Sequence, residues 1–159
     1  TNPFYSYADS PRGFPRWIQR ARFLTHLASG YVHSDGDVVT YDDVVYDPTA
    51  GYDVGNTRWA VPISGVYDVN AGLATTGNTD GIRLVLSLRV GGTTTSSSRA
   101  HSGSSGPLGI VISRSIYLGA GSLIDVILNI SGAATDRALS AGNQNTYFTA
   151  QLIEPCVIT

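Results

Sequence analysis

Carboxylates are the side chains of this sequence with the clearest capacity for chemistry. Asp35 and Asp37 flank a glycine in the segment Ser34-Asp35-Gly36-Asp37, and further aspartates follow downstream. Carboxylate oxygens are the ligands that calcium prefers, so the segment predicts a calcium site at Asp35 and Asp37. The spacing does not match a calcium loop that ends in glutamate. Aspartate is also common in turns, because its side chain hydrogen-bonds the nearby backbone.

The other reactive side chains do not form a catalytic set. The histidines His26, His33 and His101 are scattered, with no spacing typical of metal ligands. Serine is abundant, but no Gly-x-Ser-x-Gly sequence provides a nucleophile elbow. Asp42 and Asp43 are adjacent, so on a strand they point to opposite faces and cannot converge as the carboxylate pair of a glycosidase. We therefore expect no enzymatic activity and no cofactor, apart from the calcium considered above.

Composition restricts the class of protein further. The chain of 159 residues fits one domain, and 42% hydrophobic against 14% charged residues, with 18 glycines, favours a β-rich protein with many turns. A net charge of −2 without clustered cations argues against a nucleic-acid partner. No run approaches the roughly 20 apolar residues of a membrane helix, so we expect no membrane insertion. Cys156 is the one cysteine, which excludes an intrachain disulfide.

Alternating apolar residues predict a series of strands with no helix between them. Ile82, Leu84, Leu86, Leu88 and Val90 share one face of the clearest one. The predicted strands are Ala21–Ser29, Val38–Tyr46, Thr57–Val61, Val66–Ala74, Ile82–Val90, Leu108–Leu118, Leu123–Ile130 and Thr146–Ile153. The Gly/Ser/Thr-rich segments Gly91–Gly106 and Gly132–Asn145 are predicted to be loops. About eight to ten antiparallel strands indicate an all-β jelly-roll sandwich.

Two segments carry a family resemblance. Arg58-Trp59-Ala60-Val61-Pro62-Ile63-Ser64-Gly65-Val66-Tyr67 reads as strand, tight turn and strand, and Tyr147-Phe148-Thr149-Ala150-Gln151-Leu152 as a closing strand. Together with Ala21-Arg22-Phe23 at the start, they resemble the globular head of complement subcomponent q, in the tumour-necrosis-factor-like (TNF-like) superfamily. The chain is most similar in style to the stand-alone heads of bacteriophage virion proteins. It departs from the pattern at Ser122 and Ala150, where an acidic residue and a glycine are usual.

The resemblance implies a homotrimer that assembles through one sheet. The segment Leu123–Ile130 appears apolar on both faces, as a strand buried between a core and a partner would be. The predicted trimer interface consists of Leu123, Ile124, Val126, Ile127, Leu128, Tyr147 and Phe148.

The first twenty residues differ from the rest of the chain. Large aromatic residues are interleaved with prolines, which disfavour regular structure while supplying apolar groups. We predict an extended arm over residues 1–20 that anchors the head or connects it to an upstream domain, a head domain over 21–155, and a tail over 156–159. The anchoring residues of the arm are Phe4, Tyr5, Tyr7, Phe14 and Trp17.

Two functions fit this organisation. The first is a non-enzymatic trimer on a bacteriophage virion surface, as a capsid decoration, head spike or fibre tip, bound to other virion proteins through the arm. The second is a receptor- or glycan-binding head for host attachment, or a secreted, extracellular lectin-like module. The residues predicted to line its binding loops are Tyr31, Tyr41, Arg99, His101, Asn143 and Asn145.

Overall fold

The computed structural model describes residues 21–78, 81–132 and 136–156. Within these ranges it contains twelve strands and no helix, so the prediction of an all-β fold is confirmed. The same ranges hold no helix long and apolar enough to cross a membrane. The strands are β1 (Arg22–His26), β2 (Tyr31–Ser34), β3 (Asp43–Tyr46), β4 (Tyr52–Asp53), β5 (Arg58–Ala60), β6 (Gly65–Ala74), β7 (Arg83–Val90), β8 (Thr93–His101), β9 (Gly109–Leu118), β10 (Leu123–Ser131), β11 (Asp136–Leu139) and β12 (Tyr147–Pro155).

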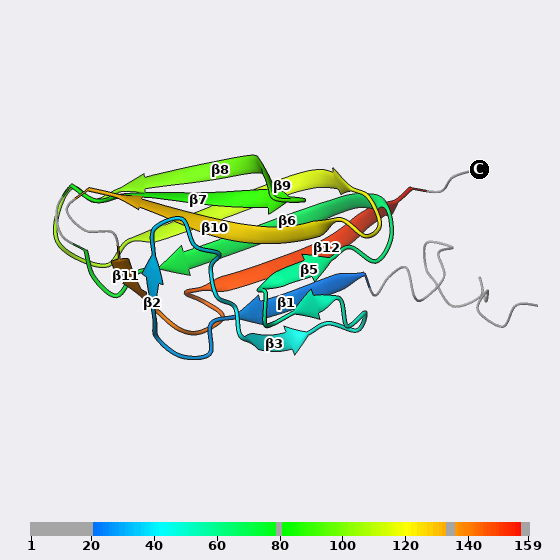
Figure 1. The fold of residues 1–159 in the computed structure, drawn as a ribbon, viewed down its shortest axis with the longest axis horizontal. Coiled ribbons are helices and arrows are strands. Elements are labelled where there is room, and N and C mark those ends of the chain that lie inside the picture. Colours follow the sequence, from blue (N-terminus) through cyan, green and yellow to red (C-terminus); the bar gives the residue numbers. More distant parts are fainter. Residues whose placement is uncertain (1–20, 79–80, 133–135, 157–159) are drawn as a thin grey trace, which may run out of the picture.

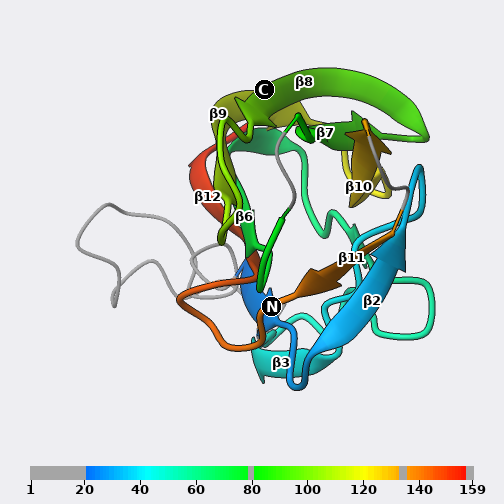
Figure 2. The same cartoon turned by 90° about the vertical axis from the view of Figure 1, so that its left-hand side faces the viewer.

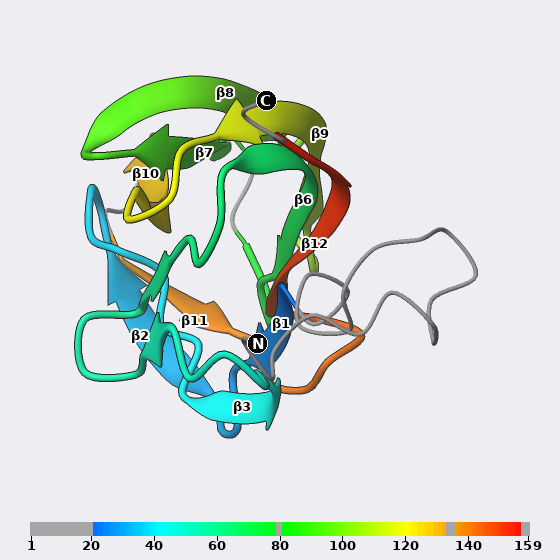
Figure 3. The same cartoon turned by 90° about the vertical axis from the view of Figure 1, so that its right-hand side faces the viewer.

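Two five-stranded sheets form the sandwich (Figure 1). The first, here the β12 sheet, has the order β3-β1-β12-β6-β9, and the second, the β10 sheet, has the order β4-β5-β10-β7-β8. All of their strand pairs are antiparallel. Figure 3 shows the β12 sheet running from β9 near the top, through β6, β12 and β1, to β3 at the bottom. Six of the eight neighbouring pairs join strands that are not consecutive in the sequence, and β4–β5 and β7–β8 are the two exceptions. This topology is that of a jelly roll.

The core lies between the two sheets because each strand alternates buried and exposed residues. Leu84, Leu86 and Leu88 of β7 are fully buried, as the sequence pattern predicts. An aromatic cluster occupies the part of the core under β1: the Phe23 ring lies 4.7 Å from that of Trp59 and 4.8 Å from that of Phe148, centroid to centroid. Offset and edge-to-face contacts of this kind add to the stabilisation from burial alone.

The turn before β6 depends on close packing. Gly65 is not among the residues with positive φ, so it is not needed here for a left-handed conformation. A Cβ added at Gly65 would instead collide with the backbone carbonyl oxygen of Glu154 and the side chain of Leu152 on β12. Glycine is therefore required because two strands of the β12 sheet approach each other at this point.

Two segments predicted to be loops contain strands. Thr93–His101 forms β8, an edge strand of the β10 sheet, and Asp136–Leu139 forms β11. Both are polar and largely exposed, so they lack the apolar alternation from which strands are predicted. The opposite difference occurs at Val38–Tyr46, where only Asp43–Tyr46 forms a strand and Val38 makes an isolated bridge with Ile127.

A third, two-stranded sheet of β2 and β11 lies at one end of the sandwich, facing the viewer in Figure 2. The chain that follows β2 is attached to the β10 sheet through its backbone, because Val39 N donates to Val126 O and Leu128 N donates to Asp37 O. The side chain of Asp35 adds a further link, accepting a 2.6 Å hydrogen bond from Ile130 N. These bonds hold the segment after β2 along the part of β10 that does not pair with β5.

Candidate functional site: an apolar sheet face

The outer face of the β12 sheet carries a group of exposed apolar side chains. Nine large hydrophobic residues are exposed in the described ranges, and five of them belong to this sheet. They are Val44 and Val45 on the edge strand β3, Val111 and Tyr117 on β9, and Ile153 on β12. Val44 lies opposite the buried Thr25 in the register and is therefore on the inward side of β3, so it does not belong to the outer face. Tyr117 and Val111 have the largest exposed fractions of the five, 58% and 54%. A face of this composition is typical of a surface that packs against another protein.

One row of this face is built around Tyr147. The strand register places His26, Tyr147, Gly72 and Val111 side by side across β1, β12, β6 and β9. A Cβ added at Gly72 would lie 2.6 Å from Cε1 of Tyr147, so the tyrosine ring rests flat over the glycine. Gly72 thus provides the space that holds the ring on the sheet.

Polar pairs separate the apolar parts of the face. Ser115 Oγ on β9 donates to Asp68 Oδ1 on β6 at 2.5 Å. Arg22 on β1 donates from Nη2 to the hydroxyl of Tyr46 at 3.0 Å, and its guanidinium carbon lies 4.4 Å from the centre of that ring. The polar groups of these two pairs are therefore satisfied within the chain.

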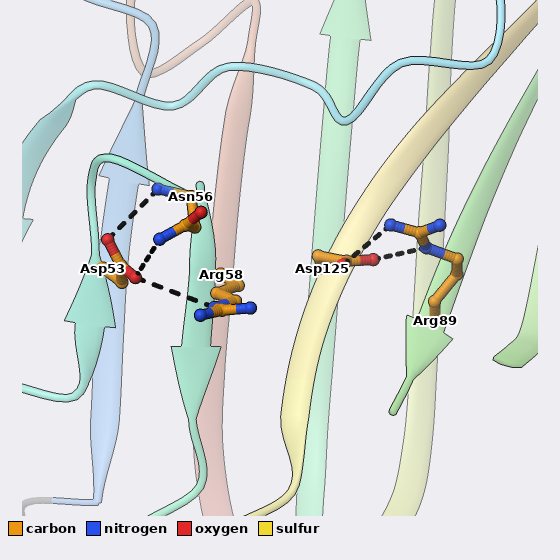
Figure 4. A network of polar contacts seen from close by, with 5 residues as sticks. All are labelled: Asp53, Asn56, Arg58, Arg89 and Asp125. Atoms are coloured by element: carbon orange, nitrogen blue, oxygen red, sulfur yellow. Dashed lines mark hydrogen bonds and ion pairs between the residues drawn. The ribbon is translucent and has the colours of Figure 1, made fainter. Parts of the chain in front are cut away.

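The outer face of the β10 sheet is polar and internally paired. Arg89 on β7 donates from Nε and Nη2 to the two carboxylate oxygens of Asp125 on β10, at 2.6 and 2.8 Å (Figure 4). Neighbouring positions on β7 and β8 carry Ser87, which is buried, and Ser97, which is exposed, and the two face each other in the register. Leu123 and Ile127 on β10 also point outward, so this face is mainly polar but not free of apolar groups.

The predicted trimer interface on β10 is wrong for most of its residues. Ile124, Val126 and Leu128 have no exposed surface, because all three point into the core of the single chain. Phe148 on β12 is likewise fully buried. The segment appeared apolar on both faces, but its outward positions are Leu123, Asp125, Ile127 and Asn129. Of the predicted interface, Leu123, Ile127 and Tyr147 retain exposed surface.

The residues predicted to bind a ligand come from separate elements. Tyr31 lies on β2 and is 40% exposed, while Arg99 and His101 are exposed on β8. Asn143 and Asn145 are exposed in the loop before β12, where Asn145 Nδ2 donates to Ala141 O at 2.8 Å.

The prediction that Tyr41 lines a binding loop is wrong. This residue has no exposed surface, and the centre of its ring lies 5.5 Å from that of Phe148. Burial raises the pKa of the Tyr41 hydroxyl well above its ordinary value. This residue belongs to the core and cannot line a binding loop.

The calcium ligands predicted from sequence have other roles in part. Asp35 accepts the backbone hydrogen bond from Ile130, and Asp37 bonds through its backbone to Leu128. Among the described residues no three histidine, cysteine or acidic side chains group together as a metal site would require. Calcium binding stays a prediction without a cluster to carry it.

Sequence reasoning did not identify one buried and one partly buried polar residue of the small sheet. His33 on β2 has no exposed surface, and Arg137 on β11 faces it in the strand register. The four-residue strands Tyr-Val-His-Ser and Asp-Arg-Ala-Leu are too short for their alternation to be recognised in advance.

The predicted anchoring arm, residues 1–20, lies outside the described residues. Cys156 follows β12 and is exposed.

Comparisons with known proteins agree on the fold. No protein-family model matches the chain, and no curated protein sequence matches it either. Solved structures do match. The globular domain of zebrafish complement 1qA protein superposes with a TM-score of 0.68 at 17% identity, over 86% of this chain and 99% of that one. Eiger TNF from S. frugiperda gives 0.63 at 15% identity, over 87% and 97% of the two chains, and murine APRIL at pH 5.0 gives 0.61 at 18%, over 83% and 99%. The chain therefore has the TNF-like jelly-roll fold predicted from its sequence.

Proposed function

We propose that this chain is a non-enzymatic head domain that forms a homotrimer through the outer face of the β12 sheet. The observation that carries the proposal is the gathering of exposed apolar side chains on that face, including Val111, Tyr117 and Ile153. Burial of each large side chain contributes about 1.5–3 kcal/mol to association, before the cost of ordering is subtracted. The threefold symmetry rests on the family resemblance, which implies a closed ring of identical subunits.

The finer role that we propose is that of a bacteriophage virion protein. The trimer would decorate a capsid or form a head spike or fibre tip, displayed on the virion surface. Residues 1–20 would attach it to other virion proteins, since five aromatic side chains can each bury on the order of 150–250 Å² against a neighbour. Support for this role comes from the similarity of the sequence to stand-alone phage heads and from its aromatic arm.

A receptor- or glycan-binding head is the second candidate. It is favoured by Arg99 and His101, which are both exposed and alternate on the same face of β8. Tyr31, exposed on β2, adds an aromatic surface of the kind that stacks on sugars. On this alternative the arm would be a connector, and activity would depend on residues of β2 and β8.

Assembly through the β12 sheet is tested by light scattering. The wild-type chain should have three times the 16.8 kDa mass of the monomer. Tyr117→Glu should give folded monomers, because burying an unpaired carboxylate in an apolar interface costs several kcal/mol. Ser97→Glu, which adds the same charge to the outer face of the β10 sheet, is the matched control and should remain trimeric. A monomeric wild type, or a trimeric Tyr117→Glu, would contradict the proposal.

The two biological roles are separated by deletion and by binding. Removing residues 1–17 should leave a soluble trimer that no longer incorporates into virions. An arm-deleted trimer that incorporates normally would show that attachment lies elsewhere. Screening the wild type and Arg99→Ala on host surface glycans tests the alternative, which requires binding that the substitution weakens. Release of reducing ends from those glycans would contradict the non-enzymatic assignment.

A further inference from the structure

His33 is an ionisable residue completely enclosed between the small sheet and β10. It has no exposed surface, and its Nε2 atom lies 3.4 Å from the carbonyl oxygen of Leu128. A carbonyl oxygen only accepts hydrogen bonds, so Nε2 carries the proton and Nδ1 of the neutral ring is an acceptor. The Nδ1 atom is buried and has no hydrogen-bond partner among the described residues. Burying a polar atom in this way costs free energy, which calls for an explanation.

Arg137 faces His33 across the β2–β11 pair. Its Nη1 atom donates to the carbonyl oxygen of Asp136 at 2.6 Å. Its Nε and Nη2 atoms are buried and have no acceptor within the described part of the chain. Facing residues of an antiparallel pair project to the same side of a sheet, so the side chains of Arg137 and His33 leave the strands on the same side.

A second arginine shows what these two atoms bind. In Arg89 the same edge of the guanidinium, Nε and Nη2, holds both oxygens of the Asp125 carboxylate (Figure 4). This two-pronged geometry matches carboxylates and other planar oxyanions. Arg137 has the same pair of donors, both buried and without an acceptor in the described part of the chain.

We propose that Arg137 and His33 form a binding site for a small carboxylate or planar oxyanion, taken up together with a proton on His33 Nδ1. With a neutral ring, the lone pair of Nδ1 repels an anion. Once Nδ1 is protonated, the site offers three N–H donors and two positive charges to one negative charge. The imidazole proton comes from solvent, and no covalent bond is formed or broken in the ligand.

The charges around the site set the direction of its pH dependence. Burial lowers the pKa of His33, which is the largest effect, while the Leu128 hydrogen bond and the carboxylates of Asp37, Asp35 and Asp136 oppose it. Asp35 is already held by Ile130 N, and Asp37 and Asp136 are exposed to water. On β11, Arg137 is the cation opposite His33 in the strand register. An anion on Arg137 favours the protonated ring, so anion affinity increases as the pH falls.

Nuclear magnetic resonance of the full chain tests the site directly, with nitrate and formate as probes and chloride keeping the ionic strength constant. At about pH 5.5, below the ordinary histidine pKa, both probes should produce saturable shifts in the Arg137 Nε and His33 ring signals. At about pH 7.5 the affinity should be clearly weaker. Arg137→Gln should weaken binding about tenfold or more, the effect of losing a charged hydrogen bond.

Three further variants serve as controls for the binding experiment. Arg114→Gln removes an exposed arginine of β9 and should bind as the wild type does. His33→Gln should lose the pH dependence of binding. Arg137→Lys keeps the charge without the planar pair of donors and should bind weakly, which gives a second test if Arg137→Gln does not fold.

Three outcomes would overturn the proposal. They are the absence of a saturable shift at Arg137 and His33, equal shifts in Arg137→Gln, and an affinity that does not change with pH.

Discussion

The two sheets of this jelly roll share one core, but their outer faces differ in composition. The face of the β12 sheet carries Val111, Tyr117 and Ile153 in exposed positions, with Tyr147 laid over Gly72. The face of the β10 sheet pairs Arg89 with Asp125, shows serine and threonine on β8, and has Leu123 and Ile127 as outward apolar residues. Its central charged pair is satisfied within the chain, while the other face has apolar surface that a partner can cover.

The largest expected effect concerns the two sides of β10. Leu128→Ala should lower the free energy of unfolding by about 2–5 kcal/mol, because Leu128 is fully buried and its truncation leaves a cavity. Ile127→Ala, on the outward side of the same strand, should cost clearly less. Urea denaturation of both variants provides the measurement. Equal losses would mean that the outer face of the β10 sheet is also packed, and the contrast between the faces would fail.

Breaking the Arg89–Asp125 pair tests whether the polar face is internally satisfied. The side chains are 24% and 16% exposed, between the values typical of surface and buried pairs. A double-mutant cycle with Arg89→Gln and Asp125→Asn should give a coupling energy of about 1–2 kcal/mol that decreases only modestly with salt. Coupling near zero would show that the pair contributes nothing to the stability of this face.

Gly72→Ala tests the apolar face at its centre. The added Cβ would lie 2.6 Å from the Tyr147 ring, which must move outward. Since a ring can shift more easily than backbone, we expect little change in monomer stability and a trimer dissociation constant raised about tenfold, or 1.4 kcal/mol. Gly109→Ala on β9 is the control, because its Cβ would meet only Leu73 O, at 4.0 Å. Unchanged assembly of the Gly72 variant, measured by sedimentation, would remove Tyr147 from the interface.

The smallest expected effect is a dependence of the folding stability on pH, which arises from His33 next to β10. The pKa of His33 is lowered by burial, so the unfolded chain binds this proton more readily than the folded chain does. Stability should therefore be constant above about pH 6.5 and decrease as the pH falls from there toward the folded pKa. Without added oxyanions, His33→Gln should remove this component, and His101→Gln, exposed on β8, should retain it. Urea denaturation at several pH values tests the slope, and a slope that survives His33→Gln would assign it to another group.

The long apolar strands of this protein could be predicted from its sequence. Alternation located β6, β7, β9, β10 and β12 to within a few residues, because each buries one face against the opposite sheet. The segment Arg58–Tyr67 and the closing strand Tyr147–Leu152 carried the resemblance, and together with the number of predicted strands they indicated the jelly roll. The absence of a recognisable catalytic set was also read from residue types alone, and it stays a prediction.

Strand β10 shows the limit of predicting buried faces from the sequence pattern. Its apolar residues were counted correctly, but Ile124, Val126, Leu128 and Ile130 all lie on one side, as a strict period of two requires. The polar strands β2, β8 and β11 were not predicted as strands, because their pairing depends on neighbours and not on an apolar pattern.

The sequence by itself therefore determined the fold class, since burial of alternating side chains is a local property of each strand. Tertiary structure decided which sheet face is left uncovered. That choice depends on strand order, and the order brings Val111, Tyr117 and Ile153 onto one surface from two distant segments. The same holds for His33 and Arg137, which become neighbours only because β2 pairs with β11 across most of the chain. Local patterns determine what a strand buries, and long-range pairing determines which side chains meet.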